Sequence, residues 1–268
     1  MSGPSSTDTR AIAPLQRALQ MVVIPDLVSR RAHAPPKSTH VLPVSEQNLL
    51  SLANACLDSS HAVEAQLEAL LAQGCSMDQL YLEVIANTAR LLGRWWTSDK
   101  LDFANLTLGV ERLQAIVRHW DERFQRSGQP LPGANRCAVL LLSEFNDQHS
   151  LGVLMLQAFF KRDGWRVHNT WGMEEAHLLR HLRSHVVHLI GLSVCTDRSL
   201  GRIKRLIQNI RQCSLNPEIQ VMLGGPLLLA QPEMAQDLGA DWLSGHADRA
   251  SQEANERVVV RSDTHRNH

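Results

Sequence analysis

The sequence predicts an α/β protein in which a small four-helix bundle precedes a five-stranded parallel sheet. Two observations lead to this fold class. Between residues 45 and 126, apolar residues recur at intervals of three and four, which is the period of amphipathic helices. Beyond residue 136, short and continuously apolar runs alternate with helical patterns, as expected for parallel strands that are covered by helices on both faces.

Length and composition narrow the class of protein further. The chain has 268 residues, enough for one large or two modest domains, and Lys plus Arg equal Asp plus Glu at 27 each. This balance gives no reason to expect a nucleic acid or a membrane as a partner. No apolar run approaches the roughly 20 residues that cross a bilayer, and no secretory signal is visible. The five cysteines form no C-x-x-C pair. We therefore expect a cytoplasmic protein with reduced thiols.

The helical half is expected to follow an N-terminal extension and linker at residues 1–44, which contains the proline-rich segment AHAPPKSTHVLP. Residues 45–126 then hold four helical patterns: SEQNLLSLANACLD, SHAVEAQLEALLAQG, SMDQLYLEVIANTARLLGRWW and DFANLTLGVERLQAIVRHWDERF. Ser76 opens the third pattern and Gln79 follows three residues later, which is the arrangement of a capping box. Short connections between the patterns predict an antiparallel bundle.

The second half begins after residues 127–135, where Gly and Pro mark a linker. Residues 136–258 hold five strand patterns separated by helical ones: RCAVLLLS, WRVHNT, VVHLIGLSV, IQVMLGG and ADWLS. Because crossovers between parallel strands are right-handed, the favoured strand order is 2-1-3-4-5, a flavodoxin-like (Rossmann-like) topology. Residues 259–268 are expected to form a C-terminal tail.

Polar residues and glycines follow three of these strands at their carboxyl ends, where sheets of this order bind ligands. They are Asp147, His149 and Gly152 after the first strand, Ser193 after the third, and Gly224 and Gly225 after the fourth. Each alone has an ordinary explanation as a surface residue, a helix cap or a turn. Together they predict a ligand site in which the Asp147 carboxylate orients the His149 imidazole toward a metal, and Gly152 lets a bulky group approach.

A second group of histidines occurs at helical spacing. His177, His181, His185 and His188 follow one another at intervals of three or four residues. No acidic or thiolate ligand lies between them, so a solvated helix face is expected rather than a metal site.

The pattern Asp147-x-His149-x-x-Gly152, with Ser193 and then Gly224-Gly225, resembles the cobalamin-binding domain of methionine synthase, corrinoid methyltransferase subunits and mutases. That family has Ser-x-Leu where this chain has Ser193-Val194-Cys195. The resemblance implies that His149 replaces the benzimidazole of the cofactor as the lower cobalt ligand. It also implies that the displaced nucleotide tail runs toward Ser193 and past the two glycines.

The helical half resembles the bundle of cobalamin-dependent photoreceptor regulators, in which a Trp after Leu-Gly-x-x covers the upper face of the corrin. Trp96 has that position here, with Trp95 beside it; the alternative is that the pair only closes the end of the bundle. A light sensor of this kind carries a Glu-His pair where this chain has Leu106-Thr107, and a His where it has Thr97, so its upper-face chemistry is not carried over.

A closer resemblance is to the AerR/PpaA group of antirepressors from purple photosynthetic bacteria. The matching positions are Leu92, Gly93, Trp96, Asp99, Phe103, Thr107, Gly109, Arg112, Leu113 and Gln114. The resemblance implies a light- or cobalamin-dependent regulator, not an enzyme. Such a regulator binds no nucleic acid itself and acts on a DNA-binding repressor of the CrtJ/PpsR type.

Two alternatives remain open at this stage. One is a corrinoid carrier subunit of a methyltransferase. The other is a sensor of the same fold with haem in place of adenosylcobalamin or hydroxocobalamin, because His149 suits haem iron equally well. The intact Asp147, Ser193 and double glycine favour cobalamin, since haem has no nucleotide tail.

Overall fold

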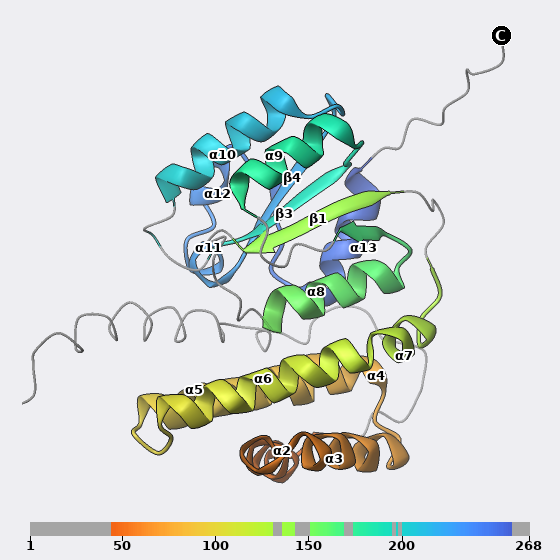
Figure 1. Cartoon of the computed structure of the whole chain (residues 1–268), viewed down its shortest axis with the longest axis vertical. Helices are drawn as coiled ribbons and strands as arrows, with labels where there is room; N and C mark the ends of the chain where they lie inside the picture. Colours follow the sequence, from red (N-terminus) through yellow and green to blue (C-terminus); the bar gives the residue numbers. More distant parts are fainter. Residues whose placement is uncertain are drawn as a thin grey trace, which may run out of the picture. The chain divides into compact units, whose positions relative to one another are not determined.

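The protein is described by a computed structural model. It covers residues 44–130, 136–142, 151–168, 174–194, 197 and 200–258. The chain forms two compact units, one made mainly of residues up to Asp121 and the other mainly of residues from Glu122 onwards (Figure 1). The expected C-terminal tail, and all but the last residue of the expected N-terminal extension, lie outside the described residues.

The first unit is helical, as predicted, and we call it the helical unit. Its elements are α2 (Glu46–Asp58), α3 (Ser60–Ala72), α4 (Met77–Gln79), η1 (Leu80–Ile85), α5 (Ala86–Thr97) and α6 (Phe103–His119). The capping box is confirmed. The Gln79 N–H donates to Ser76 Oγ and the Ser76 N–H donates to Gln79 Oε1, both at 3.2 Å. Each bond satisfies a backbone donor that the first helical turn leaves without a partner.

The π-helical segment η1, which joins α4 to α5 without a break, was not predicted from the sequence. Its apolar side chains Leu80, Tyr81, Val84 and Ile85 have no exposed surface at all. The π-helical turn therefore forms part of the core of the helical unit.

The second unit, which we call the α/β unit, contains the predicted parallel sheet. Its strands are β1 (Cys137–Leu142), β2 (Arg166–His168), β3 (Leu189–Ser193), β4 (Gln220–Gly224) and β5 (Trp242–Leu243). They pair in the order β2-β1-β3-β4-β5, and every pair is parallel. The expected order 2-1-3-4-5 is thus confirmed, and the order reverses between β1 and β3.

Helices cover both faces of this sheet. They are α7 (Asp121–Arg126), which leads into the unit, α8 (Leu151–Arg162), α9 (Glu175–Ser184), α10 (Leu200–Cys213), α11 (Pro226–Ala230), α12 (Met234–Asp237) and α13 (Ala247–Arg257). Figure 1 shows α9 and α10 side by side on one face, with α8 and α13 on the other.

The main core of the α/β unit lies between the sheet and the α9–α10 layer. α9 and α10 bury Leu178, Leu182, Ile203, Leu206, Ile207 and Ile210 against Val139, Ile190, Leu192, Val221 and Leu223 of the strands. Burial of each such side chain contributes about 1.5–3 kcal/mol to folding. This packing holds the strands in register and so fixes the positions of their carboxyl ends.

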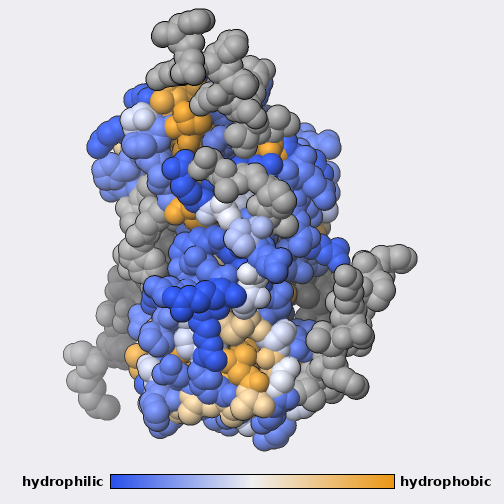
Figure 2. All heavy atoms as spheres, turned by 90° about the vertical axis from the view of Figure 1, so that its right-hand side faces the viewer, coloured by the Kyte–Doolittle hydropathy of each residue, from blue (hydrophilic) through white to orange (hydrophobic). Residues whose placement is uncertain are grey.

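The surface is mainly hydrophilic. Figure 2 shows one face of the molecule, on which apolar side chains gather in separate areas on the two units. The exposed large apolar side chains among the described residues are Phe103, Leu108, Val186 and Leu215. None of the described helices is long and apolar enough to cross a membrane.

Candidate functional site

The carboxyl ends of β1, β3 and β4 lie in one row. Leu142 at the end of β1 pairs with Ser193 at the end of β3, and Ser193 pairs with Gly224 at the end of β4. The sheet therefore brings Ser193 and Gly224 to the same edge, on the side where the strand order reverses. Asp147 and His149, expected to act at this edge, lie in residues 143–150 outside the described residues, so their role stays a prediction.

Gly225 occupies a position that only glycine fits. Its φ is +96°, a conformation that L side chains rarely adopt. A β-carbon there would lie 2.5 Å from the Val194 carbonyl oxygen and 3.0 Å from Ser193 Oγ. The end of β3 therefore packs directly against the backbone at the end of β4.

The neighbouring Gly224 is also constrained by the fold. A β-carbon on it would lie 2.9 Å from the carbonyl oxygen of Ser244, which follows β5. At both glycines, the space that a side chain would fill is taken by the backbone of the adjoining strand end. The fold alone thus accounts for the double glycine, and the expected passage of a nucleotide tail past it stays a prediction.

Two serine side chains lie at this edge of the sheet. Ser193 is half-buried, and its hydroxyl faces the backbone of Gly225. Ser244 is 8% exposed, and its Oγ has no hydrogen-bond partner among the described residues. Its backbone N–H donates to the Leu223 carbonyl at 2.9 Å, which places it beside β4. A buried hydroxyl without a partner is costly unless a ligand or water completes it, so Ser244 is a candidate site residue.

Ser244 was not among the site residues predicted from the sequence. The available signal was a Ser-Gly pair directly after the fifth strand, at the same edge as Ser193 and Gly224. Gly245 has its own packing reason, because a β-carbon on it would lie 2.9 Å from Leu229 Cδ2.

Gly152 and Trp96 lie on helices. Gly152 is the second residue of α8 and is exposed, which is compatible with the close approach of a ligand. Trp96 is half-buried in the last turn of α5, where its carbonyl accepts a hydrogen bond from the Asp99 N–H at 3.1 Å. Trp96 belongs to the helical unit, and its contact with a corrin stays a prediction.

Several of the matching positions between Leu92 and Gln114 have structural roles in the helical unit. A β-carbon on Gly109 would lie 3.1 Å from Leu92 Cδ1, so glycine lets α6 approach α5 closely. Arg112 Nη1 donates to the Cys56 carbonyl at 2.6 Å and so connects α6 to α2. Gln114 is 2% exposed, and its Nε2 has no partner among the described residues.

The histidines near α9 do not all form a solvated helix face, so that prediction is wrong for His181 and His188. The His181 ring lies 4.1 Å from the ring of His168 on β2 and 4.3 Å from that of His185. His188 lies beyond α9, where its Nδ1 accepts a hydrogen bond from the Cys137 N–H at 3.1 Å. Packing of His181 against β2 and of His188 against β1 leaves both rings half-buried.

This packing changes the proton affinities of the rings. Burial, followed by the neighbouring His168 and His185, lowers the pKa of His181 below 6.5. Burial, His185 and Arg166 lower the pKa of His168, and burial with Arg166 and Arg136 lowers that of His188. In the described part of the chain, no three His, Cys, Asp or Glu side chains are placed to hold a metal ion.

The α/β unit is similar to known proteins. Residues 138–255 match the family model of the B12 binding domain. The chain is 23% identical over 167 residues to an uncharacterized 20.5 kDa Rhodobacter capsulatus protein named for the bchF-crtJ intergenic region, covering 62% of this chain and 84% of that protein. The monomethylamine corrinoid protein of Methanosarcina barkeri has the same fold, with a TM-score of 0.65 and 14% identity. That match covers 79% of this chain and 99% of the other.

The described residues at the carboxyl edge fit the demands of such a domain. The nucleotide tail of cobalamin carries ribose and phosphate oxygens. The buried Ser244 hydroxyl, which has no partner among the described residues, would supply a hydrogen bond to such a group at this edge. The Ser193 hydroxyl lies at the adjoining strand end. The strand order and these two hydroxyls agree with the match of residues 138–255 to the model of the B12 binding domain.

Proposed function

We propose that this protein is a cobalamin-binding transcriptional antirepressor that acts on a DNA-binding repressor of the CrtJ/PpsR type. The observation that carries the proposal is the B12-binding domain, with Ser193 and Ser244 at the carboxyl edge of its sheet. The relative named for the bchF-crtJ intergenic region supports the link to this class of repressor. In this proposal the protein is a regulator and not an enzyme.

The residues of the chain have separate tasks in the proposed site. His149 would hold cobalt through one imidazole nitrogen, and the Asp147 carboxylate would accept a hydrogen bond from the other nitrogen and so fix the ring. The hydroxyls of Ser193 and Ser244 bind the nucleotide tail. Bound adenosylcobalamin supplies a light-sensitive cobalt–carbon bond, whereas hydroxocobalamin lacks one.

A regulatory role further requires that cofactor binding favour the conformation that engages the repressor. The cofactor shifts that equilibrium only by the difference between its affinities for the two conformations. Trp96 in the helical unit is the proposed contact for the upper face of the corrin. Rearrangement of this unit is therefore the proposed conformational change that the repressor senses.

The first test is the substitution His149→Ala. We expect the wild-type protein to change the absorbance spectrum of hydroxocobalamin as imidazole replaces the benzimidazole, and we expect the variant to lose this change. The matched control is His177→Ala, which removes an exposed histidine of α9 and should leave the spectrum of the complex as in the wild type. Full affinity and an unchanged spectrum in His149→Ala would contradict ligation by this residue.

The second candidate function is a corrinoid carrier subunit, favoured by the likeness of fold to a corrinoid protein over 79% of this chain. The two functions are separated by adding the cobalamin-loaded protein to a purified repressor of the CrtJ/PpsR type bound to its operator DNA, in the dark and after illumination. A change in operator binding supports the antirepressor. Methylation of the bound corrinoid by a methyltransferase, with no effect on the repressor, supports the carrier.

A further inference from the structure

The α9–α10 layer carries an excess of positive charge. α9 and α10 together contain Arg180, Arg183, Arg202, Lys204, Arg205 and Arg211, against the single carboxylate of Glu175. The whole chain has equal numbers of basic and acidic residues. On the other face of the sheet, the two charge signs nearly balance: α8 and α13 carry Lys161, Arg162, Arg249 and Arg257 against Asp248, Glu253 and Glu256. Positive charge is thus concentrated on one face of the α/β unit.

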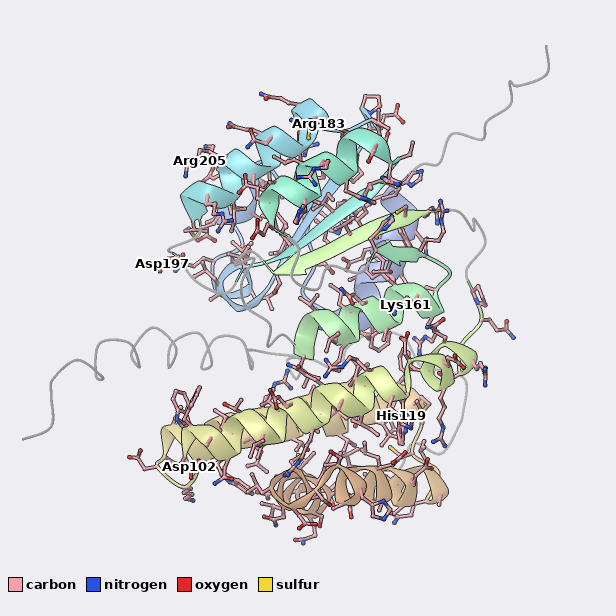
Figure 3. The ribbon with its side chains drawn as sticks, in the orientation of Figure 1. Asp102, His119, Lys161, Arg183, Asp197 and Arg205 are labelled. Atoms are coloured by element: carbon pink, nitrogen blue, oxygen red, sulfur yellow. The ribbon has the colours of Figure 1, made fainter. Side chains whose placement is uncertain are left out.

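Four of these six cations form no ion pair within the part of the chain that the structure describes. Arg202 pairs with Glu175 at 3.4 Å and Arg211 with Asp241 at 3.0 Å. The other four, Arg180, Arg183, Lys204 and Arg205, are exposed, and none of them forms an ion pair with another described residue. Figure 3 shows Arg183 on α9 and Arg205 on α10 directed away from the sheet.

Helix stability does not account for this arrangement. Exposed helices usually gain from opposite charges four residues apart, and α10 contains no acidic residue to form such a pair. The amino-terminal turn of a helix favours negative charge, yet the first turn of α10 has no acidic residue and contains Arg202. The neighbouring like charges therefore destabilise the isolated helix. This indicates that the cations serve a contact with another molecule.

The chemistry of the cations indicates their partner. All but one of the six are arginines, whose planar guanidinium binds carboxylate or phosphate groups through paired hydrogen bonds. Nucleic acid is the less suitable ligand, because the sequence pI is about 7.2 and neither helix carries a Phe, Tyr or Trp on which a base would stack. A local patch of a few arginines on a neutral protein instead matches a local acidic area on another protein.

We propose that the exposed face of α9 and α10, centred on Arg183 and Arg205, docks against an acidic surface of a protein partner. The inference rests on the proposed function in taking that partner to be the DNA-binding repressor. The contact is made through carboxylates of the repressor, away from its positively charged DNA-binding face. The arginines steer the encounter and fix the orientation of the complex.

The test compares two double variants with the same change in net charge. Arg183→Glu with Arg205→Glu reverses the charge of the proposed docking face. Arg166→Glu with Arg249→Glu reverses two exposed arginines of the α/β unit outside this face and serves as the control. Each full-length protein is loaded with cobalamin, and its binding to a purified repressor of the CrtJ/PpsR type is measured by surface plasmon resonance at several salt concentrations.

We expect the docking-face variant to bind the repressor at least about tenfold more weakly than the wild type, mainly through slower association, and to lose most of the salt dependence. The control should bind as the wild type does. Cobalamin binding should be unchanged in both variants, which shows that they are folded. Arg183→Gln with Arg205→Gln removes the charges without reversing them and should give a smaller loss in the same direction.

The outcomes separate this proposal from the proposed function. If the wild type binds the repressor and the docking-face variant binds equally well, the docking surface is wrong and the antirepressor function stands. If the wild type does not bind the repressor, the antirepressor function fails and the docking surface fails with it. If the wild type alone binds a labelled DNA duplex and the docking-face variant does not, the face binds nucleic acid and the proposal of a protein partner is overturned.

Discussion

Gly225 has a φ of +96°, and a β-carbon added to it would lie 2.5 Å from the Val194 carbonyl oxygen. The substitution Gly225→Ala therefore combines backbone strain with a clash that only movement of β3 or β4 relieves. We expect the free energy of unfolding to fall by about 2–4 kcal/mol, measured by urea denaturation followed by circular dichroism. The affinity for cobalamin should fall as well, because the same shift displaces Ser193.

The matched control for Gly225→Ala is Gly201→Ala. A β-carbon on Gly201 has no neighbour within 4 Å, and the residue lies in α10. Alanine is the better helix former, so this variant should be as stable as the wild type or more stable by up to about 1 kcal/mol. Equal stability of Gly225→Ala and the wild type would show that the turn after β4 adapts without cost.

At the level of elements, the approach of α6 to α5 and α2 depends on Gly109, where a β-carbon would lie 3.1 Å from Leu92 Cδ1 and 3.6 Å from Cys56 Cβ. The substitution Gly109→Leu should lower the free energy of unfolding by about 1–3 kcal/mol, because a large side chain forces the helices apart. Ala115→Leu adds the same side chain at an exposed position of α6 and should change stability by less than about 0.5 kcal/mol. Thermal denaturation of the two variants measures the difference, and equal melting temperatures would rule out a tight crossing.

At the level of the whole molecule, three half-buried histidines make folding sensitive to acid. The pKa values of His168, His181 and His188 lie below 6.5 in the folded protein, and burial is the main cause in each case. Just below pH 6.5 the unfolded chain therefore binds more protons than the folded one. Stability is complete above that pH and is lost as the pH falls through 6.5 toward the lower folded pKa values.

Urea denaturation at a series of pH values between about 5 and 8 measures this dependence. His181→Gln removes one of the three rings whose pKa the fold lowers, so the loss of stability below pH 6.5 should be shallower in this variant. His177→Gln changes an exposed histidine on the same helix and should keep the wild-type slope. Parallel slopes for His181→Gln and the wild type would exclude the ring cluster as the source.

The sequence by itself determined most of the helices, the five strands and their order, and the capping box at Ser76, but not the π-helical η1 or the division between α6 and α7. These features depend on local signals, namely the period of apolar residues, helix-capping side chains and the handedness of crossovers. The row formed by Ser193 and Gly224 followed from the strand order, because parallel strands end at one edge. The family match for residues 138–255 agrees with the motif that contains Asp147 and His149, although these two residues lie outside the described ones.

Only the tertiary structure decided how residues far apart in the sequence meet. It placed Val194 against Gly225 and brought His168 of β2 against His181 of α9. It buried the Ser244 hydroxyl with no partner among the described residues. It also left Arg183 and Arg205 exposed together on one layer of helices. The period of apolar residues in the sequence indicates which side of its own helix or strand a residue faces. The burial of a side chain, its pKa and the clustering of charges depend on which other element packs against that side.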